Sequence, residues 1–174
     1  MDKKALTETD IRTKFITPAI AGEGGSKWNL LTQVLEERYF TKGRVIVRGK
    51  TTTRGEAKKA DYILYYKLNI PLAVIEAKDN NHAVGAGMQQ ALEYAEILDL
   101  PFAHSSNGDA FLDHDRTGTG SMVEREIPLD QFPTPEELWR RYRAAEGYTA
   151  AQETVTTQDY YEDGSAKSST RSTA

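Results

Sequence analysis

Two acidic residues and one lysine stand at the ends of two neighbouring apolar segments of this 174-residue sequence. Asp61 opens the segment 60–66, whereas Glu76 and Lys78 close the segment 71–78. Charged side chains at the end of a buried strand must be paired or bound to a ligand. Two carboxylates and water suit Mg²⁺, which lowers the pKa of bound water and stabilises charge on a phosphate. The pattern therefore indicates a candidate site for metal-assisted phosphate chemistry.

The remaining candidate groups extend this site. Lys78 is expected to orient or deprotonate an attacking water, or to neutralise the phosphate. The same residues also fit a structural ion pair, in which Lys78 pairs with Glu76 or Asp61. Glu8 is a further candidate carboxylate, although an acid in the first turn of a helix is favourable by itself. Both alternatives stay open on the sequence alone.

Local periodicity predicts the elements that position these groups. β-Branched and aromatic residues predict a strand over 60–66, and a mostly apolar run predicts a second strand over 71–78. The turn signals between them predict a hairpin. Side chains two residues apart share a face of a strand, so Glu76 and Lys78 point the same way. The hairpin is expected to bring Asp61 close to both.

Apolar spacing predicts three helices and a strand around this hairpin. Residues 7–20 predict a helix that the following glycines end, and residues 28–39 predict a second helix. Residues 44–48 predict a strand. A later helix over 83–98 places Gln90 and Tyr94 four residues apart, so they point the same way and are candidates for contact with a nucleic-acid backbone.

The rest of the chain completes an α/β pattern with four or five strands in a mixed central sheet. The remaining predictions are strands over 102–105 and 110–112, a helix over 135–145, and a polar linker or disordered tail over 149–174. The three histidines are scattered, and Asp113-His114-Asp115 is expected to form an exposed turn. Trp28 and Trp139 are assigned to the core.

Composition excludes several functions, and the distribution of charge matters more than the total. No cysteine is present, which excludes disulfide scaffolds, iron–sulfur sites and cysteine nucleophiles, and no apolar run is long enough to cross a membrane. The net charge is −4, but residues 1–78 hold 15 basic and 9 acidic residues. Eight of the basic residues lie between Arg38 and Lys59. This local positive potential attracts polyanions, although charge runs are also common on solvated surfaces.

Several motifs appear in an order and spacing that resembles the nuclease domain of the restriction (R) subunit of type I restriction enzymes. This domain belongs to the PD-(D/E)xK nuclease superfamily. The matching stretches are Lys59 to Leu64, Pro71 to Lys78, Gln90-Ala91-Leu92-Glu93-Tyr94 and Ser106-Asn107-Gly108. Residues 7–12 and 138–142 also fit, so the resemblance covers about residues 5–148.

The resemblance implies a restriction-endonuclease-like α/β fold and a Mg²⁺-dependent endonuclease that cuts double-stranded DNA. A cytoplasmic location is expected by default, because the first residues have no apolar segment typical of a secretory signal. It implies that Asp61, Glu76 and Glu8 hold the metal and that Lys78 is the catalytic lysine. The implied partners are DNA and the methyltransferase (M) and specificity (S) subunits, with no membrane. The DNA-contacting or site-supporting residues are expected to be Gln90, Tyr94, Arg54, Lys58 and Lys59.

The sequence also departs from this family. Its R subunits are far longer, and they continue into an ATP-driven translocase. No Gly-x-x-x-x-Gly-Lys-Ser/Thr motif is present here, so we expect no ATP site in this chain, although full-length subunits need ATP. We expect a nuclease domain over 1–148 and no translocase after the tail. The alternatives are a truncated, non-catalytic remnant that binds DNA or the M and S subunits, and a stand-alone nuclease.

Overall fold

The computed structural model describes residues 1–42, 44–46, 57–120 and 122–147 of the chain. The tail expected over 149–174 lies outside these residues, as does Arg54. Within the described ranges, no helix has both the length and the apolar character needed to cross a bilayer.

A mixed sheet of seven strands forms the centre of the described chain, in the order β2-β1-β3-β4-β5-β6-β7. Neighbouring strands are antiparallel, except for β4 and β5, which are parallel. The strands are β1 (Val34–Thr41), β2 (Arg44–Ile46), β3 (Lys58–Lys67), β4 (Ile70–Ala77), β5 (Phe102–Ser106), β6 (Ala110–Asp115) and β7 (Glu124–Pro128). The predicted mixed sheet is confirmed. The predicted four or five strands are wrong, because β1 and β7 were not expected.

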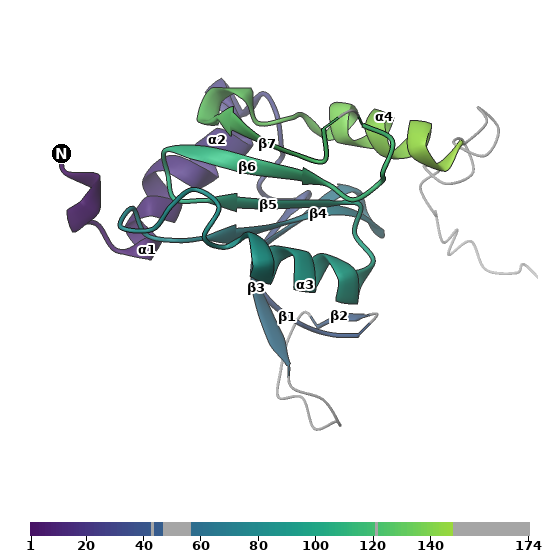
Figure 1. Cartoon of the computed structure of the whole chain (residues 1–174), viewed down its shortest axis with the longest axis horizontal. Coiled ribbons are helices and arrows are strands. Elements are labelled where there is room, and N and C mark those ends of the chain that lie inside the picture. The colour runs from purple at the N-terminus through teal and green to yellow at the C-terminus, as the bar shows by residue number, and fades with distance from the viewer. Residues whose placement is uncertain (43, 47–56, 121, 148–174) are drawn as a thin grey trace, which may run out of the picture.

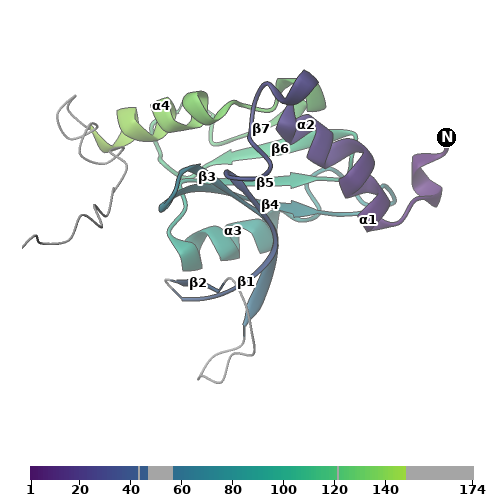
Figure 2. The ribbon, with the colours of Figure 1, turned by 180° about the vertical axis from the view of Figure 1, so that it is seen from behind.

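Helices cover both faces of this sheet (Figures 1 and 2). The helices α1 (Glu8–Ile11), α2 (Thr17–Ala21) and α4 (Pro135–Glu146) lie on one face, and α3 (Met88–Leu98) lies on the other. Two apolar clusters fill the layers. Ile11 and Trp139 belong to the first, with Phe111 of β6, whereas Ala91 of α3 packs with Val74 in the second. The assignment of Trp28 and Trp139 to the core is confirmed.

The N-terminal helix follows the predicted range but contains a π-helical turn. The Thr7 side chain caps α1 by accepting a hydrogen bond from the Asp10 N–H, and the Asp10 carboxylate accepts one from the Thr7 N–H. The π turn, η2 (Arg12–Ile16), then joins α1 to α2. Gly22 ends the helix at a φ of +75°, which glycine adopts without steric cost. The predicted helix over 7–20 is therefore confirmed in extent.

The predicted helix over 28–39 is wrong, because most of this segment is loop and strand β1. Trp28 is buried, and its indole N–H donates to the Pro133 carbonyl at 2.8 Å. The Asn29 side chain then accepts the N–H of Leu31, which turns the chain. Leu31 is 93% exposed, so the apolar residues at helical spacing in this segment do not form the buried face of a helix.

Candidate active site

The antiparallel ladder between β3 and β4 runs out at the pair Tyr62 and Ile75. One residue further, Asp61 and Glu76 stand opposite each other and are joined through their side chains. The Asp61 N–H donates to Glu76 Oε1 at 3.3 Å, and the Ala77 N–H donates to Asp61 Oδ2 at 2.8 Å. The hairpin thus holds the two carboxylates side by side, as strand alternation predicted.

Glu76 is the more deeply buried acid of this pair. Only 3% of the residue is exposed. Burial, and next the charge of Asp61, raises the pKa of Glu76 to about 9. A buried carboxylate beside a second carboxylate does not ionise readily unless a cation lies close by. Carboxylate oxygens are the hard donors that Mg²⁺ prefers, so this donor set fits the metal that the sequence predicted.

Lys78 and Glu8 border the carboxylate pair. Lys78 follows β4 directly, and its N–H donates to the Ser106 carbonyl at 2.9 Å. Burial and then the charge of Asp61 raise the pKa of Glu8, whereas the charge of Lys78 lowers it, so these groups share one electrostatic environment. Among the described residues, no three acidic or histidine side chains lie close enough to hold a metal together. The structure therefore brings Asp61 and Glu76 together but leaves Glu8 at the margin.

The predicted Gln90 and Tyr94 pair lies on α3. Gln90 Nε2 donates to the Tyr94 hydroxyl at 2.6 Å. The Tyr94 ring is buried and packs edge-on against Phe40, with ring centroids 4.9 Å apart. Tyr94 therefore supports the second apolar cluster, while Gln90 is half-buried and can offer its amide oxygen to other contacts.

Basic side chains lie just before Asp61 on β3. Lys58 pairs with Glu93 of α3, and Lys59 Nζ lies 3.6 Å from Glu37 of β1. Both lysines are partly exposed. Exposed ion pairs of this kind contribute little to stability and exchange easily, so both lysines can turn to phosphate groups.

Gly87 allows α3 to begin close to the carboxylate pair. The helix starts at Met88, later than the predicted residue 83. The Gly87 N–H donates to Ser105 Oγ at 3.0 Å. A Cβ at Gly87 would lie 3.0 Å from Ser105 Oγ and 3.1 Å from Glu76 Cβ, tighter than ordinary contact. The absence of a side chain here sets the distance between α3 and β4.

We expect Gly87→Ala to lower the free energy of unfolding by about 1–3 kcal/mol, because overpacked sites force neighbouring atoms apart. Urea unfolding measures this change. Gly120→Ala is the control, because the nearest heavy atom to a Cβ there lies 3.4 Å away. Equal free energies of unfolding for the two variants would contradict the expectation.

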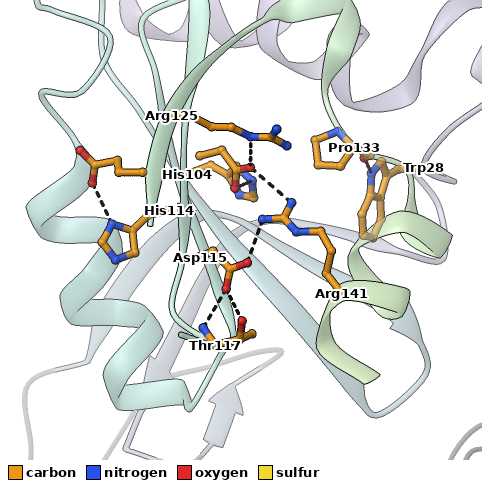
Figure 3. Close-up of polar contacts among 10 residues, drawn as sticks. Trp28, His104, His114, Asp115, Thr117, Arg125, Pro133 and Arg141 are labelled. Carbon is orange, nitrogen blue, oxygen red and sulfur yellow. Dashed lines mark hydrogen bonds and ion pairs between the residues drawn. The ribbon is translucent and has the colours of Figure 1, made fainter. Parts of the chain in front are cut away.

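A second charged cluster lies away from this site, and no sequence pattern predicted it (Figure 3). Asp113 Oδ2 accepts from Arg125 Nε at 3.4 Å and from Arg141 Nη1 at 3.3 Å. Arg141 Nη2 also donates to Asp115 Oδ2 at 3.3 Å. His104 is fully buried, and its Nε2 lies 3.2 Å from Asp113 Oδ1 without the alignment of a hydrogen bond. The cluster joins α4 and the edge strand β7 to β6.

The prediction of an exposed turn at Asp113-His114-Asp115 is therefore wrong. These residues belong to β6, and both aspartates are buried. Burial of the two carboxylates is possible because Arg141, on the last described helix, reaches both of them.

The chain is similar to two known proteins, one in sequence and one in structure. The chain is 52% identical over 164 residues to the type I restriction enzyme EcoAI endonuclease subunit of Escherichia coli. The chain is homologous to part of a type I restriction endonuclease subunit. Among solved structures, it matches a fragment described as an HsdR subunit of a type I restriction enzyme from Vibrio vulnificus, with a TM-score of 0.66 and 41% identity over 83% of this chain.

These matches confirm the restriction-endonuclease-like fold that the sequence predicted. They cover only part of the relatives. The chain spans 20% of the length of the E. coli subunit and 27% of the V. vulnificus chain, whereas the first match includes 94% of this chain. No protein-family model matches the chain.

Proposed function

We propose that this chain is the Mg²⁺-dependent endonuclease module of a type I restriction enzyme R subunit and hydrolyses phosphodiester bonds of double-stranded DNA. One observation carries the proposal: Asp61 and Glu76 are opposed at the end of a buried hairpin, with Lys78 two residues further along. Homology to an endonuclease subunit supports it. The proposal includes a cytoplasmic location and association with the M and S subunits.

Each residue of the pair has a distinct part in this proposal. Asp61 and Glu76 would hold Mg²⁺, which supplies charge stabilisation to the phosphate and lowers the pKa of bound water. The backbone N–H groups of Asp61 and Ala77 fix the two carboxylates, so little reorganisation is needed. Lys78 would orient the attacking water or neutralise the phosphate. Glu8, at the edge of the site, would supply an additional carboxylate.

DNA would lie along the basic start of β3 and the first turns of α3. Lys58 and Lys59 would contact phosphates, as would Arg54, and Gln90 would contact the backbone through its amide oxygen. Tyr94 would act indirectly by holding Gln90. Contacts of this kind position a duplex without reading its sequence, so target choice belongs to another subunit. The ATP that full-length R subunits need would act outside this chain.

Lys78→Met is expected to lower Mg²⁺-dependent cleavage of plasmid DNA by roughly 10²-fold or more, because an aligned proton-transfer or charge-stabilising group contributes about that much. Lys67→Met, at the opposite end of the same hairpin, is the control and should cleave like the wild type. The assay records nicked and linear products over time, with and without EDTA. Full cleavage by Lys78→Met would contradict the proposed role.

A chimera separates a nuclease from a non-catalytic remnant. This chain replaces the matching 164 residues of the E. coli subunit, and restriction of DNA is measured with the complete enzyme. We expect the chimera to cut DNA and its Lys78→Met form to fail. A correctly folded chimera that assembles and binds DNA but never cuts it would overturn the proposal in favour of the remnant.

A further inference from the structure

The site contains a buried arginine that the roles above do not use. Arg12 lies on the N-terminal helix, and its side chain is only 10% exposed. Its Nη1 donates to Glu37 Oε1 at 3.2 Å, and its Nη2 donates to the Asp61 carbonyl at 3.4 Å. Nη1 also lies 4.0 Å from Asp61 Oδ1, and the guanidinium covers the Tyr62 ring at 4.9 Å. Four groups therefore fix this side chain.

The local backbone also departs from regular structure where Arg12 begins. Arg12 is the first residue of the π-helical turn, one helical turn after Glu8. Single π turns are rare within α-helices, and they often occur at functional sites. Here the turn lies next to Asp61, near the start of β3.

Glu37 adds an independent irregularity on the opposite side. It lies within strand β1 with a φ of +49°, a left-handed value that side chains other than glycine rarely adopt. The pairs Glu36–Tyr62 and Arg38–Ala60 flank it, so Glu37 stands across from Asp61. Residues held in such conformations cluster at active sites and ligand clamps, where neighbouring structure over-determines them.

The alternation of side chains between the two faces of the sheet is interrupted at this point. Ala60 packs in the cluster around α3, whereas Tyr62 packs in the cluster on the other face, although residues two apart share a face in a flat strand. The distortion therefore centres on Asp61 and Glu37. It turns the Glu37 carboxylate toward the guanidinium of Arg12.

We propose that Arg12 and Glu37 form a positioning clamp for Asp61, the inferred metal ligand. Ala77 N–H already fixes Asp61 Oδ2, and the clamp restrains the opposite side through Oδ1 and the backbone carbonyl. Glu37 neutralises Arg12, so the clamp adds no net charge beside a cation site. Both are positioning residues and not catalytic ones, because the contacts that assign them a role are made to Asp61 and to each other. This inference rests on the proposed function.

The metal affinity of Arg12→Met tests the clamp without relying on cleavage. Removing a positive charge near a cation site should by itself tighten Mg²⁺ binding. We expect the opposite result, a dissociation constant at least threefold weaker by calorimetry, because Asp61 loses its restraint. Arg12→Lys should recover part of the affinity, because lysine keeps the charge but not the two-sided contact. Affinity that is unchanged or tighter in Arg12→Met would overturn the clamp.

Cleavage at saturating Mg²⁺ is the second measurement. We expect Arg12→Met to lower the saturated rate at least tenfold, whereas Lys14→Met, two residues along the same helix, keeps the wild-type rate. The double variant Arg12→Met/Glu37→Gln should be no slower than the slower single variant, because residues acting as a unit are not additive. A saturated rate equal to that of the wild type would overturn the clamp.

Two substitutions at Glu37 distinguish the effect of its carboxylate from the effect of its backbone conformation. Glycine adopts a φ of +49° without steric cost, whereas alanine adopts it only at a cost, so Glu37→Gly should unfold at a higher urea concentration than Glu37→Ala. Both should lose the same fraction of the saturated rate, since both lack the carboxylate. If Glu37→Gly cleaves like the wild type, the carboxylate has no part in positioning.

The results also separate this inference from the proposed function. If the wild type cleaves DNA and the clamp variants match it in rate and metal affinity, the clamp alone is wrong. If the wild type binds Mg²⁺ and never cleaves, the proposed function is wrong, and the weaker affinity expected for Arg12→Met still decides the clamp.

Discussion

Replacing Glu76 by glutamine is expected to abolish DNA cleavage while leaving the protein at least as stable as before. Glu76 is almost fully buried, and burial together with the charge of Asp61 raises its pKa to about 9. Without a metal, the carboxyl is therefore protonated at neutral pH. A glutamine amide has the same size and keeps an acceptor for the Asp61 N–H. The substitution thus removes a burial cost without opening a cavity.

The loss of activity follows from the loss of one carboxylate ligand. A neutral amide is a weaker ligand for a hard cation than a carboxylate. Metal charge stabilisation amounts to several kcal/mol, so cleavage should fall by roughly 10³-fold or more. Greater or equal stability combined with lost activity is the signature of a residue kept for function.

Plasmid cleavage and urea unfolding of the same preparations test this expectation. Glu126→Gln, on the exposed part of β7, is the matched control and should change neither quantity. Full cleavage by Glu76→Gln would remove Glu76 from the site. A marked loss of stability would instead show that the ionised carboxylate is a structural partner.

Asp113→Asn is expected to lower the free energy of unfolding by more than Gly87→Ala does. Asp113 is 2% exposed and accepts from both Arg125 and Arg141. Removing one charge of a buried ion pair leaves its partners uncompensated, which costs about 3–5 kcal/mol. Arg141 is itself only partly buried and keeps Asp115, so the lower end of that range is expected.

The pH dependence of this stabilisation has a definite sign. Burial alone would raise the pKa of Asp113, but the contact with His104 and the charge of Arg141 outweigh it, so the pKa lies well below its usual range. A carboxylate with a lowered pKa in the folded state stabilises above its unfolded pKa of about 3.9, and this contribution disappears as the pH falls below that value.

Urea unfolding at pH 5 and pH 3 measures this contribution. The difference in the free energy of unfolding between the wild type and Asp113→Asn should be smaller at pH 3 than at pH 5. Asp130→Asn, an exposed acid on η4 (Leu129–Gln131), is the control. A difference that grows as the pH falls would contradict the inferred ion pair.

The hairpin and its carboxylates were predictable because the signals are local. Strand alternation over two short segments and a turn place Asp61 beside Glu76, and both pairing and side-chain contacts agree. Strand β1 was not predictable in the same way. Its apolar residues happen to follow helical spacing, and the side-chain turn at Asn29 interrupts the helix that the spacing suggests.

The supporting contacts were missed for a different reason. Arg12 reaches Asp61 from 49 residues away in the sequence, and Arg141 reaches Asp113 across 28 residues. No local sequence pattern predicts contacts between residues so far apart. The sequence also gives no sign of the left-handed backbone at Glu37, because a positive φ is usually marked by glycine and this position holds glutamate. Only the position of Arg12, one turn after Glu8 in a matched motif, offered a signal.

We propose that Asp61 and Glu76 together hold the divalent cation that cleavage requires. Anomalous diffraction from crystals soaked in Mn²⁺ locates such a cation, because Mn²⁺ accepts the same oxygen ligands as Mg²⁺. We expect one anomalous peak between the two carboxylates in the wild type and none there in Asp61→Asn. A peak elsewhere, or a peak that survives in Asp61→Asn, would contradict the claim.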